Sequence, residues 1–396
     1  MRIAQPARGP PGSRRAAHSG RPLEPLLRVG RRAGDNDPMH ALLAGLTTLD
    51  VLHALDHEPD TTTKTTSIDH AMTAGGPATN AAVTIAALES LRPTRPGAPA
   101  SSIDLLTAIG EGTIASVVAA DLEACGVRAL DATAAASPVR EPAISSIVEH
   151  PAGRMVASTN ARIEVDASLG EALLGSALER NGSPDVVLVD GHNPALASFA
   201  LSLGLPDASP DDDPFARLEA RPSYARVLDG GSWKPWFAPL LPLVDVAVVS
   251  ADFRPPLLER VEGEGIADFL RGFGITCTLR TRGPEPVQWW WDGAAGETPV
   301  DEVEAASTLG AGDVFHGAFA WALGVLHEAG RPLPASPESL IRFASRIAGV
   351  STTLFGTRSW RADPRIADAV AEFLADDQAG FGASDAAERR QRSTHD

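Results

Sequence analysis

Short apolar runs alternate with amphipathic stretches along most of the chain. The apolar runs predict buried strands at residues 41–46, 103–109, 186–189, 225–228, 244–249 and 275–279, because each is short and ends in polar or glycine residues. Apolar residues at helical spacing predict helices over residues 81–88, 115–125, 314–326 and 339–353. Strands that alternate with helices in this way are typical of an α/β fold with a mostly parallel sheet covered on both faces.

Other segments have the alternation of hairpins. Residues 52–73 are polar, rich in threonine and weakly alternating, which predicts an edge hairpin. Residues 139–160 alternate on both sides of a turn at residues 151–153, which predicts a second hairpin. Residues 289–291 are three tryptophans followed by an Asp-Gly pair, and they predict a strand that runs into a hairpin turn.

The two ends of the chain lack this periodicity. Residues 1–38 are rich in Pro, Gly, Ser and Arg, so we expect a disordered or non-native extension before Met39. Residues 39–375 form one predicted domain without internal repeats, with an acidic surface insertion at 205–223. The charged residues 376–396 predict a flexible tail.

Composition narrows the classes of partner. The 396 residues carry a formal net charge of -17, which argues against nonspecific nucleic-acid binding. No apolar run is long enough to span a bilayer, so we expect no membrane partner. The two cysteines, Cys125 and Cys277, lie far apart without metal-ligand spacing, which predicts reduced thiols and a cytoplasmic protein.

A glycine-rich turn leads into the predicted helix that begins near residue 310. Gly310, Ala311 and Gly312 would let the backbone approach a ligand closely, and the unpaired N–H groups of the helix start favour a phosphate. Asp313 lies in the first turn of this helix. Its carboxylate either stabilises the helix start or takes a proton from a hydroxyl that attacks a phosphate. The local sequence allows both interpretations.

A second glycine turn, Gly75–Gly76, leads into the helix predicted over 81–88. Asn80 can donate and accept hydrogen bonds, so it either binds a hydroxyl or caps that helix. Asp50 follows the first predicted strand in a predicted polar turn, at the strand end where open α/β sheets bind ligands. A structural turn aspartate is the alternative for Asp50.

These two turns resemble known signatures. The run from Thr308 to Ala318, which contains the 310–313 residues, resembles the C-terminal signature of the PfkB (ribokinase-like) carbohydrate kinases. The run GGPATNAA at residues 75–82 resembles the N-terminal signature of the same family. The resemblance implies a three-layer αβα sandwich with a small β-strand lid, built from strands within 52–73 and 139–160. It also implies transfer of the ATP γ-phosphate to a sugar hydroxyl, with Asp313 as general base and Gly310–Gly312 as anion hole.

The resemblance also assigns binding residues. It implies that Asp50, Gly75, Gly76 and Asn80 bind the sugar, and that Thr281, Gly283, Thr308 and Ala348 lie along the nucleotide. Asp190 is a further sugar contact by analogy. Many relatives order magnesium with an Asn-x-x-Glu motif, but Ser250 and Phe253 stand in this chain, so Asp229 and Asp252 are left as open candidates. Ser307 stands where the family has an Asp at its monovalent-cation site, which leaves potassium dependence open.

The acceptor is the least determined part of this interpretation. Leu309 and the segments 191–193 and 250–252 are similar to the ketohexokinase-like branch, which favours a ketose or related furanose. Ribose and a nucleoside are the next alternatives. A non-catalytic protein that binds sugar or nucleotide as a regulator is an alternative of another class. A homodimer formed through the lid is a further expectation from the family.

Overall fold

The computed structural model describes residues 38–60, 62–94, 97, 99–205, 221–256, 258 and 263–376. The predicted extension at 1–38 and tail at 376–396 therefore lie, apart from one residue each, outside the described residues. Most of the predicted acidic insertion at 205–223 lies outside them as well.

A nine-stranded sheet forms the centre of the fold. Its strands, in spatial order, are β13 (Ala294–Thr298), β12 (Glu285–Trp291), β11 (Cys277–Arg282), β10 (Val246–Ser250), β9 (Ala225–Gly230), β8 (Val186–Val189), β1 (His40–Ala44), β4 (Ser102–Thr107) and β5 (Arg128–Asp131). The strands from β11 to β5 pair in parallel, whereas β12 and β13 are antiparallel. The prediction of a mostly parallel sheet is confirmed, and so is the hairpin after the three tryptophans.

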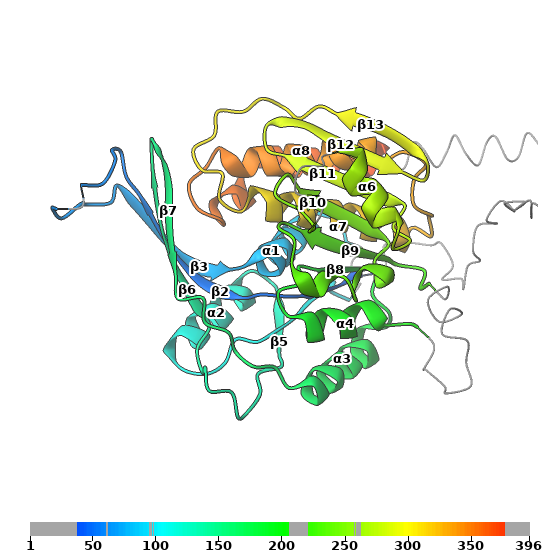
Figure 1. The fold of residues 1–396 in the computed structure, drawn as a ribbon, viewed down its shortest axis with the longest axis horizontal. Coiled ribbons are helices and arrows are strands. Elements are labelled where there is room, and N and C mark those ends of the chain that lie inside the picture. Colours follow the sequence, from blue (N-terminus) through cyan, green and yellow to red (C-terminus); the bar gives the residue numbers. More distant parts are fainter. Residues whose placement is uncertain are drawn as a thin grey trace, which may run out of the picture. The chain divides into compact units, whose positions relative to one another are not determined.

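Helices cover both faces of this sheet. The helices on one face are α1 (Pro77–Glu89), α2 (Thr113–Ala124), α7 (Ala311–Glu328) and α8 (Glu338–Thr352), and those on the other are α3 (Ala167–Asn181), α4 (Pro194–Ser202) and α6 (Glu264–Arg271). Strand β1 shows why there are two cores, since Ala41 and Leu43 face the first set while Leu42 and Ala44 face the second. In Figure 1 the strands run from β13 at the top to β5 near the bottom, with α8 beside the upper strands and α3 and α4 beside the lower ones. The predicted three-layer αβα sandwich is confirmed.

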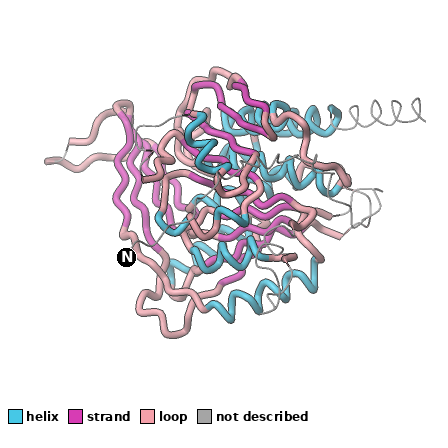
Figure 2. The backbone as a smooth tube through the Cα atoms, turned by 45° about the vertical axis from the view of Figure 1, so that its right-hand side comes forward, coloured by secondary structure: helices cyan, strands magenta, loops and turns pink. Residues whose placement is uncertain are grey.

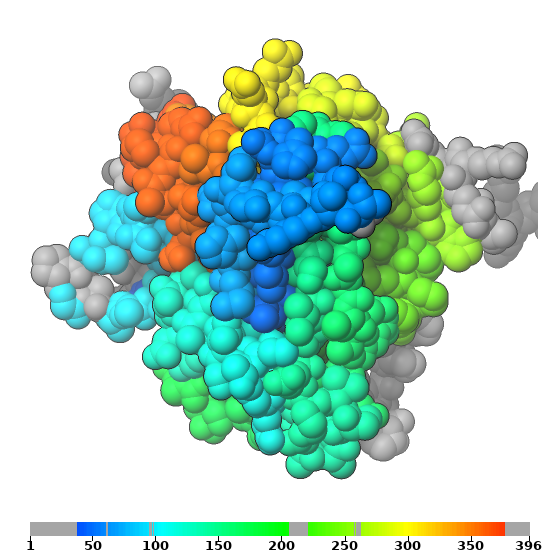
Figure 3. Space-filling model, turned by 90° about the vertical axis from the view of Figure 1, so that its left-hand side faces the viewer, coloured from blue at the N-terminus to red at the C-terminus, as the bar shows by residue number. Residues whose placement is uncertain are grey.

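A second, four-stranded sheet stands beside the first. Its order is β3 (Asp69–Gly75), β2 (Thr48–Ala54), β6 (Ala143–His150) and β7 (Gly153–Ser158). It lies at the left of Figures 1 and 2, and Figure 3 faces it, with the blue residues of β2, β3 and their connection in front. The hairpin predicted within 139–160 is confirmed.

The prediction for residues 47–73 was right about the hairpin and wrong about Asp50. The edge hairpin is confirmed, because β2 and β3 pair antiparallel and β3 is an edge strand of the small sheet. Asp50 was placed in a polar turn, but it lies inside β2, which also pairs with β6, and the turn falls at residues 45–47. The partner β6 is far away in the sequence, so local polarity suggested a turn where long-range pairing forms a strand.

Several short elements complete the described chain. They are the 3-10 helices η1 (Pro235–Phe237), η2 (Leu241–Leu243) and η3 (Ser359–Ala362), and a helical segment at residues 364–376. Helices α3, α4 and α6 were not predicted; α4 and α6 are short, with 9 and 8 residues. Within the described ranges, every helix is too short or too polar to cross a membrane.

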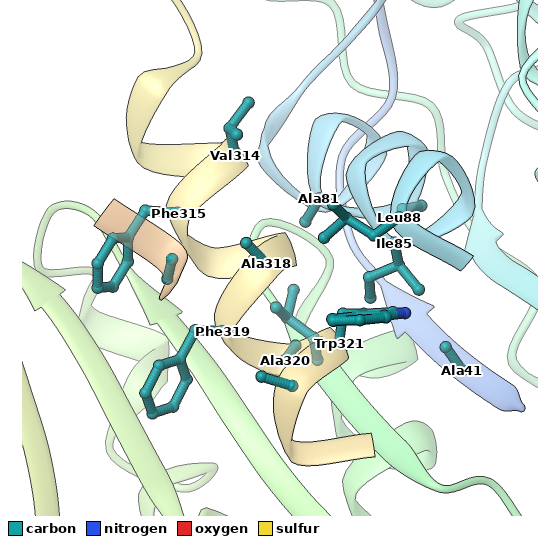
Figure 4. Close-up of a cluster of buried hydrophobic side chains, with 14 of the residues drawn as sticks. Ala41, Ala81, Ile85, Leu88, Val314, Phe315, Ala318, Phe319, Ala320 and Trp321 are labelled. Carbon is teal, nitrogen blue, oxygen red and sulfur yellow. The ribbon is translucent and has the colours of Figure 1, made fainter. Parts of the chain in front are cut away.

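Helices α1 and α7 pack unusually closely, which sets the geometry of the site below. A Cβ added at Gly317 would lie 2.6 Å from the backbone oxygen of Ala81, so only glycine permits this approach. Trp321 extends from α7 towards Ile85 of α1, whereas Phe315 and Phe319 point to the opposite side of α7 (Figure 4). The two helix starts are thereby brought together at one end of the sheet.

Candidate active site

The start of α7 is left open for a ligand. Gly310 precedes the helix in the left-handed conformation, with φ of 73°, and no side chain caps the first turn. The first N–H groups of an uncapped helix lack intrahelical partners and carry partial positive charge. Asp313 lies in this turn, so its carboxyl group stands beside free backbone donors.

Asn80 of α1 holds the Asp313 carboxyl group. The Asn80 Nδ2 donates to Asp313 Oδ2 at 2.8 Å. On its other side, Asn80 Oδ1 accepts from Arg358 Nη1 at 3.1 Å. Arg358 also donates to the Ala74 carbonyl oxygen and to Asp121. Asn80 therefore lies within α1 as a bridge between Asp313 and Arg358 and does not cap a helix.

Gly75 makes room for a carboxyl group, whereas Gly310 is favoured by its left-handed backbone and not by crowding. A Cβ added at Gly310 would lie 3.7 Å from Asn80 Nδ2 and 3.8 Å from Asp313 Oδ2. A Cβ at Gly75 would lie 2.0 Å from Asp50 Oδ2, on the neighbouring strand of the small sheet. The structure thus brings together Asp313, Asn80 and Gly310 in one group and pairs Asp50 with Gly75.

Asp50 is nearly buried, with 6% of its surface exposed. Thr48 Oγ1 donates to its Oδ1 at 2.8 Å. Burial raises the pKa of Asp50, while the hydrogen bond from Thr48 and the positive charge of Arg358 oppose that shift. The Asp50 carboxyl group is therefore held in a fixed orientation, as a binding group for hydroxyls requires.

Asp190 follows β8 and ties several loops together. Its Oδ2 accepts from the backbone N–H groups of Leu46 and Ala78, at 2.9 and 3.1 Å. Its Oδ1 accepts from the His192 N–H at 2.8 Å. Gly45 permits this arrangement, because a Cβ there would lie 2.3 Å from the Asp190 carboxyl group. With these three donors, Asp190 fixes the start of α1, the helix that carries Asn80.

A buried histidine and aspartate lie one turn beyond Asp313. His316 Nε2 lies 3.2 Å from the Val248 carbonyl oxygen, which can only accept, so this nitrogen carries a hydrogen. His316 Nδ1 lies 3.2 Å from Asp229 Oδ2, but within the described residues neither atom has a hydrogen-bond partner. Burial lowers the pKa of His316 and raises that of Asp229 to about 7.

The electrostatics of the group make Asp313 a base near neutrality. Its pKa is raised to about 7, chiefly because the carboxyl group is buried, and Asp229 adds to the shift. The hydrogen bond from Asn80 and the nearby His316 act in the opposite direction. A base is most effective when its pKa lies near the working pH, and Asp313 meets that condition.

A pH profile tests this arrangement. Asp313 accepts a proton only when ionised, so kcat is expected to fall as the pH drops below about 7. The expected slope is about tenfold per pH unit, and the rate should level off above pH 8. An ordinary aspartate carboxyl group, with a pKa near 3.8, would instead leave the rate flat down to about pH 5. Initial rates from pH 5 to 9 distinguish the two.

The residues assigned to the nucleotide come from separate elements of the fold. Thr281 is in β11, not in a turn, and Gly283 forms the hairpin turn between β11 and β12 with φ of 63°. Thr308 is exposed just before α7, and Ala348 is half-buried in α8. Within the described residues, no hydrogen bond or ion pair joins any of the four to Asp313.

The structure bears differently on the magnesium site and on the monovalent-cation site. The described residues contain no cluster of three metal-ligating side chains. Asp229 fits magnesium poorly, because it is buried and its pKa is raised to about 7, whereas Asp252 is exposed just past β10 and fits a water-mediated contact. At the suggested monovalent site, Ser307 Oγ donates to Glu149 Oε1 at 2.9 Å.

Solved structures of similar fold include three sugar kinases. Ribokinase from Giardia lamblia aligns with a TM-score of 0.62 and 14% identity, over 84% of this chain and 99% of that one. Arabidopsis thaliana ribokinase complexed with ribose and ATP aligns with 0.55 and 16%, over 86% and 99%. Fructokinase with bound ATP from Xylella fastidiosa aligns with 0.57 and 16%, over 86% and 99%. The protein has the ribokinase fold. No protein-family profile matches the chain.

Within this ribokinase fold, sequence reasoning missed two parts of the group. His316 is on the same helix as Asp313, three residues later, and that spacing was a usable signal. Arg358 gave no such signal, because the side chain that it contacts, Asn80, is 278 residues away along the chain. Its position is visible only in the folded protein.

Proposed function

We propose that the protein is an ATP-dependent sugar kinase. The observation that carries the proposal is the half-buried Asp313 carboxyl group, held by Asn80 at the uncapped start of α7. A candidate base and a set of anion-binding donors therefore lie within the first helical turn of α7. Phosphoryl transfer to a hydroxyl needs these two components, since catalysis depends mainly on positioning and charge stabilisation.

The proposed step transfers the γ-phosphoryl group of ATP directly to the acceptor hydroxyl. The acceptor O–H gives its proton to the Asp313 carboxylate while its oxygen forms a bond to the γ-phosphorus of ATP. The bond from that phosphorus to the β–γ bridging oxygen breaks, and its electron pair stays on ADP. The N–H groups of Gly310–Gly312 and the positive end of α7 stabilise the negative charge on the transferred group.

Asp50, Asn80, Gly75 and Gly76 are the proposed acceptor site. Carboxylate and amide groups that are fixed by neighbours are suited to sugar hydroxyls, because each hydroxyl both donates and accepts. The small sheet, which carries Asp50 and Gly75, is the proposed lid over the sugar. A lid would exclude water, which would otherwise compete as the phosphoryl acceptor.

ATP is the proposed donor, bound along Thr281, Gly283, Thr308 and Ala348. Two solved structures of this fold hold ATP, which supports the assignment. Magnesium, held by Asp252 through water together with the phosphates, would neutralise charge on the nucleotide.

A ketose or related furanose is the proposed acceptor, with ribose and then a nucleoside next. The test is ADP release by the full chain from ATP and magnesium, across fructose, ribose, other ketoses and nucleosides. Turnover with one class of acceptor, lost in Asp313→Asn, is the expected result. ATP binding without turnover on any acceptor would contradict the kinase proposal and favour a regulatory sugar- or nucleotide-binding protein.

A further inference from the structure

The chain contains very few lysines. Of its 34 basic residues only two are lysines, Lys64 and Lys234. Lys64 is exposed in the connection between β2 and β3. Lys234 is half-buried in the loop that follows β9, the strand that carries Asp229. A compact ammonium is thus placed near the carboxyl groups of the candidate site, in a chain that otherwise supplies arginine.

The loop around Lys234 is firmly packed. Trp233 makes edge-to-face contacts with Phe237 and Phe253, at centroid distances of 6.0 and 5.6 Å. The Lys234 ammonium lies 4.9 Å from the centroid of the Phe237 ring. Trp236 Nε1 donates to the Gly191 carbonyl oxygen, which ties the loop to the end of β8. The position of the ammonium is therefore set by aromatic packing before any ligand arrives.

The Lys234 ammonium is poorly satisfied by the protein. Its hydrogen bond is a long one, 3.4 Å, to the Ser232 carbonyl oxygen. Within the described part of the chain, no carboxylate lies within salt-bridge distance of it. Asp190 and Asp229 attract it from farther away, but Asp190 is already bound by three backbone N–H groups and Asp229 faces His316. N–H donors of Lys234 are thus left for a ligand.

The same end of the sheet carries Asp313. Asp229 lies near the end of β9 and its carboxyl group is 3.2 Å from His316, one helical turn past Asp313. The start of α7 and the loop of Lys234 therefore flank the same strand ends. An anion bound to the N–H groups of α7 would lie at the end of the sheet where the loop of Lys234 is also located.

We propose that Lys234 binds a phosphoryl-type oxyanion beside Asp313, as a substrate-binding residue of the kinase reaction proposed above. The oxyanion is the transferring γ-phosphoryl group, whose charge spreads over its outer oxygens. A lysine suits this role because its ammonium is a compact point charge with three donors. An acidic group carried by the acceptor would present the same chemistry, and the experiment separates these two sources.

The first experiment measures kcat and KM for Lys234→Met in the full chain. If Lys234 contacts the transferring group, kcat is expected to fall by about 10² or more with neutral and acidic acceptors alike, as for other transition-state donors. Lys234→Arg keeps the charge and should recover part of the rate. Arg271→Met, which removes an exposed charge on α6, is the matched control and should leave kcat unchanged.

The acceptors decide the source of the anion. A rise in KM confined to sugar acids or sugar phosphates, with normal kcat on neutral sugars, would assign Lys234 to an acidic acceptor and overturn the phosphoryl assignment. Kinetics of Lys234→Met equal to those of the wild type on every acceptor would overturn the whole proposal.

A second measurement is independent of turnover. Limited acetylation of the amines, followed by mass spectrometry, reports on the two lysines separately, with exposed Lys64 as internal reference. Inorganic phosphate, or ATP with magnesium, is expected to protect Lys234 severalfold and to leave Lys64 unchanged. Equal labelling with and without these ligands would overturn the anion site. Protection in a chain that phosphorylates no acceptor would keep the anion site and reject the kinase function.

Discussion

Asp313→Asn is expected to lower kcat by about 10² to 10⁴-fold, the range for loss of a general base. Asparagine has almost the same shape as aspartate and still accepts from the Asn80 amide, so the geometry of the α7 start is kept. What is lost is the group that takes the proton from the attacking hydroxyl. The measurement is ADP release at saturating ATP and acceptor, at pH 8, where Asp313 of the wild type is ionised.

Two controls make this result specific. Asp268→Asn changes an exposed carboxylate on α6, and its kcat should equal that of the wild type. The midpoint of thermal unfolding of Asp313→Asn should not fall, because the substitution removes a half-buried carboxyl group without leaving a cavity. A kcat of Asp313→Asn within a factor of about two of the wild type would rule out general-base catalysis by this residue, given the size of the usual effect.

Trp321→Ala is expected to lower the free energy of unfolding by about 3–5 kcal/mol, the usual cost of removing a buried tryptophan. Trp321 is fully buried where α7 meets α1, as Figure 4 shows. Its ring packs against Phe343 and Phe373, at centroid distances of 5.3 and 5.8 Å. Its Nε1 donates to Glu89 Oε2 at 2.9 Å, so the substitution also removes a buried hydrogen bond.

Equilibrium unfolding in urea measures this loss. Trp290→Ala is the matched control, because Trp290 is only half-buried in β12 and should cost clearly less. Equal losses for the two variants would show that the α1–α7 contact contributes no special stability. Since this contact also brings Asn80 to Asp313, Trp321→Ala should lower kcat before it unfolds the chain.

The fold class was predictable because it rests on local patterns. The buried strand at 186–189 and the strand start at 225 coincide with the observed β8 and β9, since parallel strands buried on both faces are continuous apolar runs. The strand β2 was not predictable in the same way. Thr48 and Asp50 are polar, and they belong to a strand only because β3 and β6 pair with them on either side.

The candidate site was likewise predictable from the sequence only in part. Asp313, with its glycine turn, and Asn80 were found from the sequence, because a helix start after glycines is a local feature. That the two side chains touch depends on the close approach of α1 and α7 at Gly317, which no pattern within either helix specifies. The role of Asp229 changed in the structure from metal candidate to partner of His316.

By itself, the sequence determined the alternation of strands and helices and the residue types at both glycine turns. These features depend on neighbours a few residues away, and propensity and periodicity report such neighbours. Only the tertiary structure decided which carboxyl groups are buried and in which direction their pKa values shift. Burial and charge pairing arise between segments such as those of Asn80 and Arg358, which the chain brings together only when it folds.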